Sequence, residues 1–362
     1  MAVAYILEQN ASIACEGERL LVKKGGSVLH TLHLFKLDQL VMFGHVALTP
    51  QATHRLLRDG VDTVFMTAAG RYRGRLEAPR GKNITLRIEQ FRRLSDPEFS
   101  LQTARAIVAG KIQNLRGVVL RLNRSREGLA LEDQILSLKR LAEKAESADE
   151  MDSLRGFEGR AAVVYFEGFA RGFLADGVVF ERRVRRPPTD PVNALLSLGY
   201  TLLLNTVLAA CSQVGLDPYL GCLHTVEYGR PSLALDLMEE WRPIIVDSLV
   251  LSVFNLKAIT LQDFVKAPMD ESDRDGENED GAFNGFPDEA AVPDKVPALP
   301  VKLTDAGFRR FIAQFERKAA QHVRYHLNGQ NLTYRDCIRE QLRHFARYLR
   351  GEEPGYQPMP LR

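Results

Sequence analysis

The chain has 362 residues, 45% of them hydrophobic and 26% charged, which is enough for two domains with hydrophobic cores of their own. Its net charge is only +2, and no apolar run reaches the roughly 18 residues that span a bilayer, so composition excludes a membrane-spanning protein. The four cysteines are scattered without a CxxC pair, which argues against disulfides, structural zinc and an iron–sulfur cluster. The first ten residues lack the regions of a secretory signal, so we expect a cytoplasmic location.

Charge is distributed unevenly along this nearly neutral chain. Residues 270–289 contain nine acidic residues and one arginine, whereas residues 80–126 contain eleven Lys and Arg against three acidic residues. Residues 307–350 contain ten Lys and Arg against three acidic residues. The two basic stretches suggest a polyanionic partner, although solvated helix faces explain them about equally well.

Residues 1–95 are predicted to be rich in β-strands, because short apolar or alternating runs are separated by Gly, Asn and Asp turn signals. One helix interrupts the strands. Thr49 is a favourable N-cap, Pro50 suits the first helical position and Gly60 suits the end. Strands resume with VDTVFM and RYRGRLE.

From about residue 99 the hydrophobic period becomes helical. The helix that opens at Asp190 and Pro191 is apolar on most sides, so we place it at the centre of the core. Residues 266–300 are rich in Pro, Asp, Glu and Gly, which predicts a disordered or loosely attached insert. The other predicted helical stretches are 99–122, 130–148, 157–170, 231–264 and 304–350.

These patterns predict an α+β fold with two domains. Residues 1–95 form a β-strand-rich N-terminal domain, and residues 96–350 form an all-α-helical C-terminal domain that carries the acidic insert at about 266–300.

Glu158 is an acidic residue on an apolar helix face. With helical spacing, Glu158, Ala162 and Tyr165 lie on the same face as Phe169, whereas Glu167 points to the opposite side. A carboxylate that faces a core must be paired, protonated or bound to a metal ion. The alternative is a first-turn glutamate satisfied by the helix dipole and nearby amides.

A second group of polar residues lies in the segment GLDPYLGCLHTVEYGRPSLALDLMEEW. Asp236 falls in the first or second turn of an apolar helix that begins near Pro231. Glu239 and Glu240 follow three and four positions later, on a neighbouring part of the same face. His224 precedes Asp236 by twelve residues, across a turn, so it can fold back toward it. A lone histidine is more often structural, but a histidine with two carboxylates on apolar faces favours a ligand set.

The ligand types limit the choice of metal. One imidazole and two carboxylates without a thiolate suit Mg²⁺ or Mn²⁺. Such an ion polarises a phosphate, activates a water or a 3′-hydroxyl and stabilises the leaving oxygen. Carboxylates inside an arginine-rich body are consistent with a nucleic-acid backbone as substrate.

The same segments resemble the CRISPR-associated adaptation endonuclease/integrase, the Cas-one family. The stretches that carry the resemblance are HTVEYGRPSLALDLMEEWRPIIVDSLV, DPVNALLSLGYTLL, GLDPYLGCLH, GFEGRAAVVYFEGF and, near the N-terminus, HTLHLFKLDQLVMFGHVALTP and RYRGRLEAP. They cover nearly the whole chain apart from the acidic insert. In that family the metal ligands match Glu158, His224 and Asp236 here, so the resemblance implies that these three residues are catalytic.

The resemblance also implies a function and partners. The expected activity is integration of short double-stranded DNA fragments into the CRISPR repeat array, in which a 3′-hydroxyl attacks a phosphodiester, together with nuclease activity on branched DNA. The expected assembly is a homodimer formed through the N-terminal domain, and two dimers would hold a dimer of the small Cas-two protein. A Cas-four nuclease would have to be a separate partner, because this chain lacks the length and cysteines of the fused proteins.

Other residues are assigned less directly. Arg230 is expected near the scissile phosphate as a DNA-binding residue, or else as a turn arginine that pairs with Glu227 or Glu239. Tyr165 and Tyr200 either line the site or belong to the core. The further possibilities are that Asn193 caps a helix and that Asp247 supports the site.

Two other functions remain open at this point. A catalytically idle DNA-binding scaffold within an adaptation complex would need the basic stretches but not all three ligands. A small-molecule metallohydrolase would need the ligands but not the spread of arginines.

Overall fold

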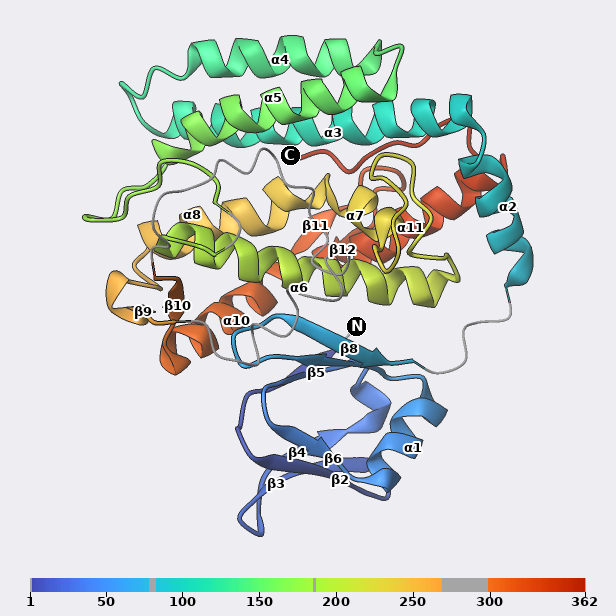
Figure 1. The fold of residues 1–362 in the computed structure, drawn as a ribbon, viewed down its shortest axis with the longest axis vertical. Coiled ribbons are helices and arrows are strands. Elements are labelled where there is room, and N and C mark those ends of the chain that lie inside the picture. Colours follow the sequence, from blue (N-terminus) through green and yellow to red (C-terminus); the bar gives the residue numbers. More distant parts are fainter. Residues whose placement is uncertain (1, 78–82, 185–186, 269–298, 362) are drawn as a thin grey trace. The chain divides into compact units, whose positions relative to one another are not determined.

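The computed structural model describes residues 2–77, 83–184, 187–268 and 299–361 (Figure 1). These residues divide into two compact units. One unit contains the described residues up to 77, and the other contains those from Asn83 onward. The first unit is rich in strands and the second in helices, as the sequence predicts.

The N-terminal unit contains two four-stranded sheets. In one sheet the order is β1-β5-β7-β8, with β8 antiparallel to β7 and the other neighbours parallel. In the other the order is β4-β3-β2-β6, antiparallel except between β2 and β6. The elements are β1 (Val3–Ile6), β2 (Ala11–Glu16), β3 (Arg19–Lys24), β4 (Ser27–His33), η1 (Leu34–Lys36), β5 (Gln39–Phe43), β6 (Val46–Leu48), α1 (Pro50–Asp59), β7 (Asp62–Met66) and β8 (Tyr72–Leu76).

Both sheets contribute to one hydrophobic core. Leu40 on β5 belongs to the same buried cluster as Leu20 on β3 and Leu56 on α1. The predicted helix in this region is confirmed: the Thr49 hydroxyl accepts a hydrogen bond from the amide of Ala52, and Gly60 ends the helix at φ 69°. That left-handed conformation favours glycine, which explains why the helix stops there.

The second unit consists mainly of helices. Three of them, α3, α4 and α5, each pack against the other two and lie together at the top of Figure 1. The helices are α2 (Ile84–Leu94), α3 (Pro97–Ser125), α4 (Glu132–Glu146), α5 (Met151–Ala170), α6 (Pro191–Val214), α7 (Ser232–Met238), the π-helical turn η2 (Arg242–Asp247), α8 (Ser248–Asn255), the 3₁₀ turn η3 (Leu261–Asp263), α10 (Asp305–Ala319) and α11 (Tyr334–Leu349).

The long helix α6 lies in the core of this unit, as predicted. By length and mean hydropathy it could cross a membrane, but 89% of its most apolar window is buried inside the protein. Its N-terminus is fixed by Asp190, whose carboxylate accepts a hydrogen bond from the amide of Asn193. Asn193 is fully buried and also bonds the backbone of Arg182 and Val184. Asn193 therefore fastens the preceding loop to the helix.

The expected domain boundary near residue 95 and the observed division differ by one helix. Helix α2 belongs to the second unit. The side-chain amide of Gln90 donates to the carbonyls of Asp217 and Leu220, and its oxygen accepts from the amide of Asp217. These buried bonds tie α2 to the loop before α7, a long-range contact that local patterns do not reveal.

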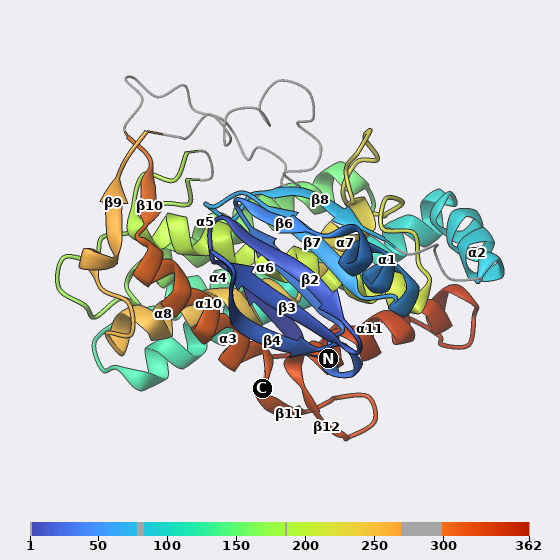
Figure 2. The same cartoon turned by 90° about the horizontal axis from the view of Figure 1, so that it is seen from below.

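Most of the predicted acidic insert at 266–300 lies outside the described residues. The strands that flank it pair with each other: β9 (Phe264–Lys266) is antiparallel to β10 (Val301–Leu303), and the two strands lie side by side in Figure 2. A second short hairpin joins β11 (His322–Arg324) to β12 (Asn331–Thr333).

The C-terminal segment after α11 crosses helix α3. The amide of Asn114 donates to the carbonyl of Met359, and the amide of Leu361 donates to the Asn114 side chain. Gly110 and Gly117 provide the room, because a Cβ atom on Gly110 would lie 2.4 Å from the Pro358 side chain. The segment therefore packs directly against the helix backbone.

This close approach predicts a difference between two helical glycines. Gly110→Ala should lower the unfolding free energy by about 1–3 kcal/mol, because the methyl group collides with Pro358. In contrast, a methyl group added at Gly156 on α5 would enter open space, so Gly156→Ala should raise stability by roughly 0.5–1 kcal/mol. Urea denaturation of both variants measures the difference. Equal shifts would contradict the packing described for the C-terminal segment.

Candidate functional site

Glu158 lies on α5 opposite a lysine on α3. The Lys111 ammonium forms an ion pair with the Glu158 carboxylate. Both side chains are largely buried, with 8% and 15% of their surface exposed. Glu158 faces the interior as its helical spacing predicts, whereas Glu167 is exposed. A core-facing carboxylate must be paired, protonated or bound to a metal ion, and in this structure Glu158 is paired with Lys111.

His224 and Asp236 are in contact, as their spacing suggests. One Asp236 oxygen accepts from the His224 amide at 3.0 Å and lies 2.6 Å from His224 Nδ1. The other accepts from the amides of Cys222 and Leu223 at 2.6 and 3.0 Å. Gly221 permits this approach, since a Cβ atom there would lie 2.4 Å from Asp236 Oδ2. The fully buried Asp236 carboxylate therefore holds the loop that carries His224.

Glu239, one turn after Asp236, faces Glu158 and His224. Its carboxylate lies 2.7 Å from Lys111 Nζ, 3.9 Å from His224 Nε2 and 3.0 Å from the guanidinium of Arg242. Only 1% of the Glu239 side chain is exposed. Lys111 Nζ thus bridges the two glutamates, and His224 presents Nε2 to the same cluster.

The cluster balances its buried charges internally. Burial alone would lower the pKa of Lys111, but the carboxylates of Glu158 and Glu239 outweigh that effect and raise it. Burial alone would raise the pKa of Glu239, yet the positive charges of Arg242 and Lys111 lower it to about 2. Both groups are therefore charged at neutral pH.

The residues fit a divalent metal ion with oxygen and nitrogen ligands. Glu158 and Glu239 offer carboxylates, and His224 offers Nε2 while Asp236 engages Nδ1, an arrangement typical of histidine ligands. Within the described ranges, no three His, Cys or carboxylate side chains are already placed as a metal site. The Lys111 ammonium occupies the space between the two glutamates.

Arg155 connects the Glu158 helix to the histidine loop. Its Nε and Nη2 donate to the carbonyl of Leu223 at 3.1 and 2.8 Å. Arg155 lies one helical turn before Glu158 and its acceptor immediately precedes His224. This contact fixes the distance between two elements that carry candidate ligands.

Arg230 lies within the same loop and pairs locally. Its guanidinium lies 3.2 Å from Glu227 and donates to the Thr225 hydroxyl at 2.9 Å. The side chain is buried, with 8% exposed. In this structure Arg230 is therefore a turn arginine paired with Glu227, one of the two roles that the sequence allowed.

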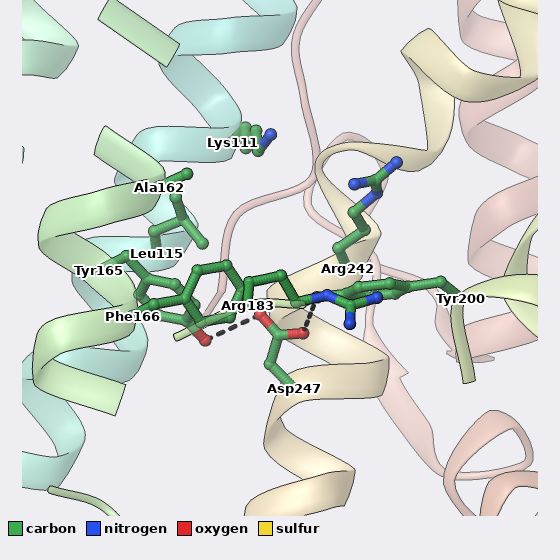
Figure 3. A pocket seen from close by; sticks show the side chains of 9 residues that line it. All are labelled: Lys111, Leu115, Ala162, Tyr165, Phe166, Arg183, Tyr200, Arg242 and Asp247. Carbon is green, nitrogen blue, oxygen red and sulfur yellow. Dashed lines mark hydrogen bonds between the residues drawn. The ribbon is translucent and has the colours of Figure 1, made fainter. Parts of the chain in front are cut away.

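A pocket adjoins the ion cluster and shares Lys111 and Arg242 with it (Figure 3). At its base the hydroxyls of Tyr165 and Tyr200 both donate to Asp247, at 2.8 and 2.6 Å. The guanidinium of Arg242 lies over the Tyr200 ring, 5.0 Å from its centroid. Tyr165 and Tyr200 are thus core residues that also line the pocket, and Asp247 supports it from below. The lining is completed by Leu115, Ala162, Phe166 and Arg183.

The sequence patterns did not identify Lys111 or Arg155, and they offered Glu239 only as a possible partner of Arg230. For Glu239 a signal exists, because it follows Asp236 by one helical turn and precedes Arg242 by another. Lys111 is distinguished only by lying next to the apolar stripe of α3. Its position against Glu158 depends on how α3 and α5 pack.

The buried Asp247 predicts a pH dependence of stability. Burial raises its pKa to about 6, although the hydroxyls of Tyr200 and Tyr165 act in the opposite direction. Between the unfolded pKa near 4 and about pH 6, the folded protein binds the additional proton, so stability falls as pH rises through this window. The unfolding free energy of wild type relative to Asp247→Asn should therefore fall by about 2 kcal/mol from pH 4 to 7.

Urea denaturation at several pH values measures this difference. Asp133→Asn, at an exposed position on α4, is the control and should show no such slope. A difference between wild type and Asp247→Asn that does not change with pH would contradict the prediction.

Known proteins share the sequence pattern of this chain. The pattern of the family described as "CRISPR associated protein Cas1" matches residues 4–272. A "CRISPR-associated endonuclease Cas1 3" from Thermus thermophilus is 36% identical over 100% of this chain and 98% of its own length. A "CRISPR-associated exonuclease Cas4/endonuclease Cas1 fusion" from Geobacter sulfurreducens is 34% identical over 97% of this chain and 59% of the fusion.

Solved structures share the fold. A chain of a "Cas6-RT-Cas1--Cas2 complex" matches with a TM-score of 0.78 at 23% identity, covering 99% of this chain and 36% of the other. A "Casposase bound to integration product" also matches with a TM-score of 0.78 at 21% identity, covering 99% of this chain and 93% of the other. The N-terminal β-sheet domain and the helical region that follows are thus those of a Cas1-like fold. The chain belongs to the Cas1 family of CRISPR-associated endonucleases.

Proposed function

We propose that this protein is a metal-dependent DNA endonuclease and integrase of CRISPR adaptation, which inserts short double-stranded DNA fragments into the repeat array. The observation that carries the proposal is that Glu158 and Glu239 meet at one buried ammonium and His224 Nε2 lies 3.9 Å from Glu239, in a chain of the Cas1 family. The basic stretches at 80–126 and 307–350 suit a substrate with a phosphate backbone.

The proposed metal ligands are Glu158, His224 and Glu239. Asp236, which the sequence favoured as the third ligand, has both oxygens engaged by three backbone amides and His224 Nδ1. An oxygen with two short hydrogen bonds has little capacity left for a metal. Asp236 instead selects the tautomer of His224 that carries its proton on Nδ1, which directs the Nε2 lone pair toward Glu239.

The reaction joins a DNA end to a target strand. The oxygen of a 3′-hydroxyl attacks a target phosphorus and loses its proton. A new P–O bond forms while the bond to the target's own 3′-oxygen breaks, and that oxygen takes up a proton. Bound Mg²⁺ or Mn²⁺ would supply Lewis-acid stabilisation of the charge on the phosphate.

The protein's own residues orient the reactants. Arg242 lies beside Glu239 and lines the adjoining pocket, so its guanidinium is placed to contact a phosphate there. Arg155 and Asp236 together keep the His224 loop fixed against α5 and α7. A rigid support of this kind reduces the reorganisation needed during the reaction.

The proposed assembly follows the named relatives. Homodimers that hold a Cas2 dimer are consistent with the similarity to a chain of a Cas1–Cas2 complex. A separate Cas4 partner is consistent with a relative in which Cas4 and Cas1 are fused. We place the reaction in the cytoplasm, where DNA repeats are accessible. Arg230 would reach DNA only by leaving its pair with Glu227.

Separate substitutions of Glu239 and Asp236 distinguish a metal ligand from a residue that only supports a ligand. Glu239→Gln should abolish detectable Mn²⁺ binding, because it removes an ionised ligand. Asp236→Asn should weaken binding by roughly 10- to 100-fold, because His224 remains but is less well oriented. Isothermal titration with Mn²⁺ measures both, and exposed Glu167→Gln on α5 is the control. Loss of binding only in Asp236→Asn would restore Asp236 as the ligand.

Joining of DNA is tested with a short duplex and a supercoiled plasmid that carries a CRISPR repeat. Wild-type protein with Mn²⁺ and a separately purified Cas2 protein should yield covalent fragment–plasmid product, because a 3′-hydroxyl is the nucleophile. A fragment with 3′-deoxy ends should yield none, while cleavage of branched DNA continues. Glu239→Gln should lose both reactions but retain salt-sensitive DNA binding.

The outcomes separate the alternatives. Joining that is unaffected by the 3′-deoxy ends would refute the integrase mechanism. DNA binding without any metal-dependent cleavage or joining would identify the idle scaffold instead. Absence of salt-sensitive DNA binding would favour the metallohydrolase.

A further inference from the structure

We infer that Lys111 is a built-in counter-cation of the active site, which holds the two glutamates together in the metal-free protein and is displaced when a divalent ion binds. The inference rests on the proposed metal site but adds a residue and a property that the proposal does not contain: control of metal loading by a lysine.

The first support is the position of the ammonium. Lys111 Nζ contacts Glu158 and lies 2.7 Å from Glu239 Oε2, so it bridges two carboxylates from α5 and the end of α7. Glu239 is almost fully buried, and Lys111 is 8% exposed. An ammonium in contact with two buried carboxylates occupies the place of a metal ion that those carboxylates would bind.

The second support is charge. Lys111 and Arg242 carry two positive charges that offset the negative charges of Glu158 and Glu239. A divalent ion between the same carboxylates would add two positive charges within contact distance of the ammonium. In a buried site this repulsion is weakly screened, so the ammonium and the ion cannot both keep their contacts with the two carboxylates.

The third support is a place for the displaced side chain. Lys111 also lines the adjoining pocket, together with Tyr165, Tyr200, Arg242 and Asp247 (Figure 3). Four rotatable bonds allow the ammonium to swing from the glutamates into this pocket without leaving the site. Asp247 supplies a negative charge at its base.

Displacement has a measurable consequence, because part of the free energy of metal binding is spent on breaking the ion pairs of Lys111. Lys111→Met keeps the apolar stem and removes the charge. Its Mn²⁺ dissociation constant should be about tenfold or more lower than that of wild type. The metal-free variant should also melt at a lower temperature, since two buried carboxylates lose their partner, and Mn²⁺ should raise its melting temperature more than that of wild type.

The experiment measures Mn²⁺ affinity by isothermal titration and melting with and without Mn²⁺, on the full chain. Lys111→Gln is a second variant whose amide still donates a hydrogen bond, in case Lys111→Met does not fold. Lys139→Met, at an exposed helical position paired with Glu143, is the matched control and should bind like wild type. A crystal structure of the wild-type protein with Mn²⁺ reads out displacement directly, through the position of Lys111 Nζ.

The two proposals fail in different ways. If neither wild type nor the Lys111 variants bind Mn²⁺, the metal site itself is refuted. If wild type binds Mn²⁺ and Glu239→Gln does not, but the Lys111 variants bind equally or more weakly, only the displacement inference is overturned. The inference is likewise overturned if Lys111 Nζ keeps both glutamate contacts in the Mn²⁺-bound crystal structure.

Discussion

Two glutamates that contact the same buried lysine are the constraint on which the helical unit of this protein depends. Glu158 comes from α5 and Glu239 from the end of α7, and both carboxylates contact the ammonium of Lys111. Lys111 on α3 provides one positive charge, and Arg242 balances the remainder. The packing of three separate helical segments is thus coupled to one electrostatic requirement. The same requirement makes the position suitable for Mg²⁺ or Mn²⁺, which prefer carboxylate oxygen.

A rigid surround keeps these charges in place. Asp236 engages the 222–224 loop through three backbone amides and the imidazole of His224, and Arg155 holds the same loop from α5. Behind the cluster, the C-terminal segment reaches Glu240: the Tyr356 hydroxyl and the Met359 amide donate to its carboxylate, whose pKa is raised to about 8 by burial. The two consecutive glutamates therefore have opposite environments. Glu239 is surrounded by positive charge and is ionised, whereas the groups that oppose the burial of Glu240 are neutral hydrogen-bond donors.

This division of roles explains how one short motif serves both folding and chemistry. In the segment LALDLMEEW, Asp236 supports the loop, Glu239 faces the cation position and Glu240 fastens the C-terminal segment. Consecutive side chains of a helix point about 100° apart, so the adjacent Glu239 and Glu240 are directed to different neighbours. The pocket beside the cluster adds the Tyr165–Asp247–Tyr200 contacts, which brace α5, α6 and η2 against one another next to the site proposed for a DNA phosphate.

The sequence by itself determined the two-part fold, the helix at 50–59 with its cap residues, the buried long helix and the Cas1 family, because these depend on local periodicity, capping and contiguous motifs. It also singled out Glu158, His224 and Asp236, since acidic or imidazole groups on apolar faces are visible in a linear pattern. Only the tertiary structure decided which carboxylate faces the cation position, that Lys111 lies between the glutamates and that α2 belongs to the helical unit. Each of these depends on contacts between residues far apart in the chain, such as Lys111 with Glu239 or Gln90 with Asp217. That Glu239 contacts Lys111 while Asp236 contacts the 222–224 loop is set by helix packing and is not encoded in spacing alone.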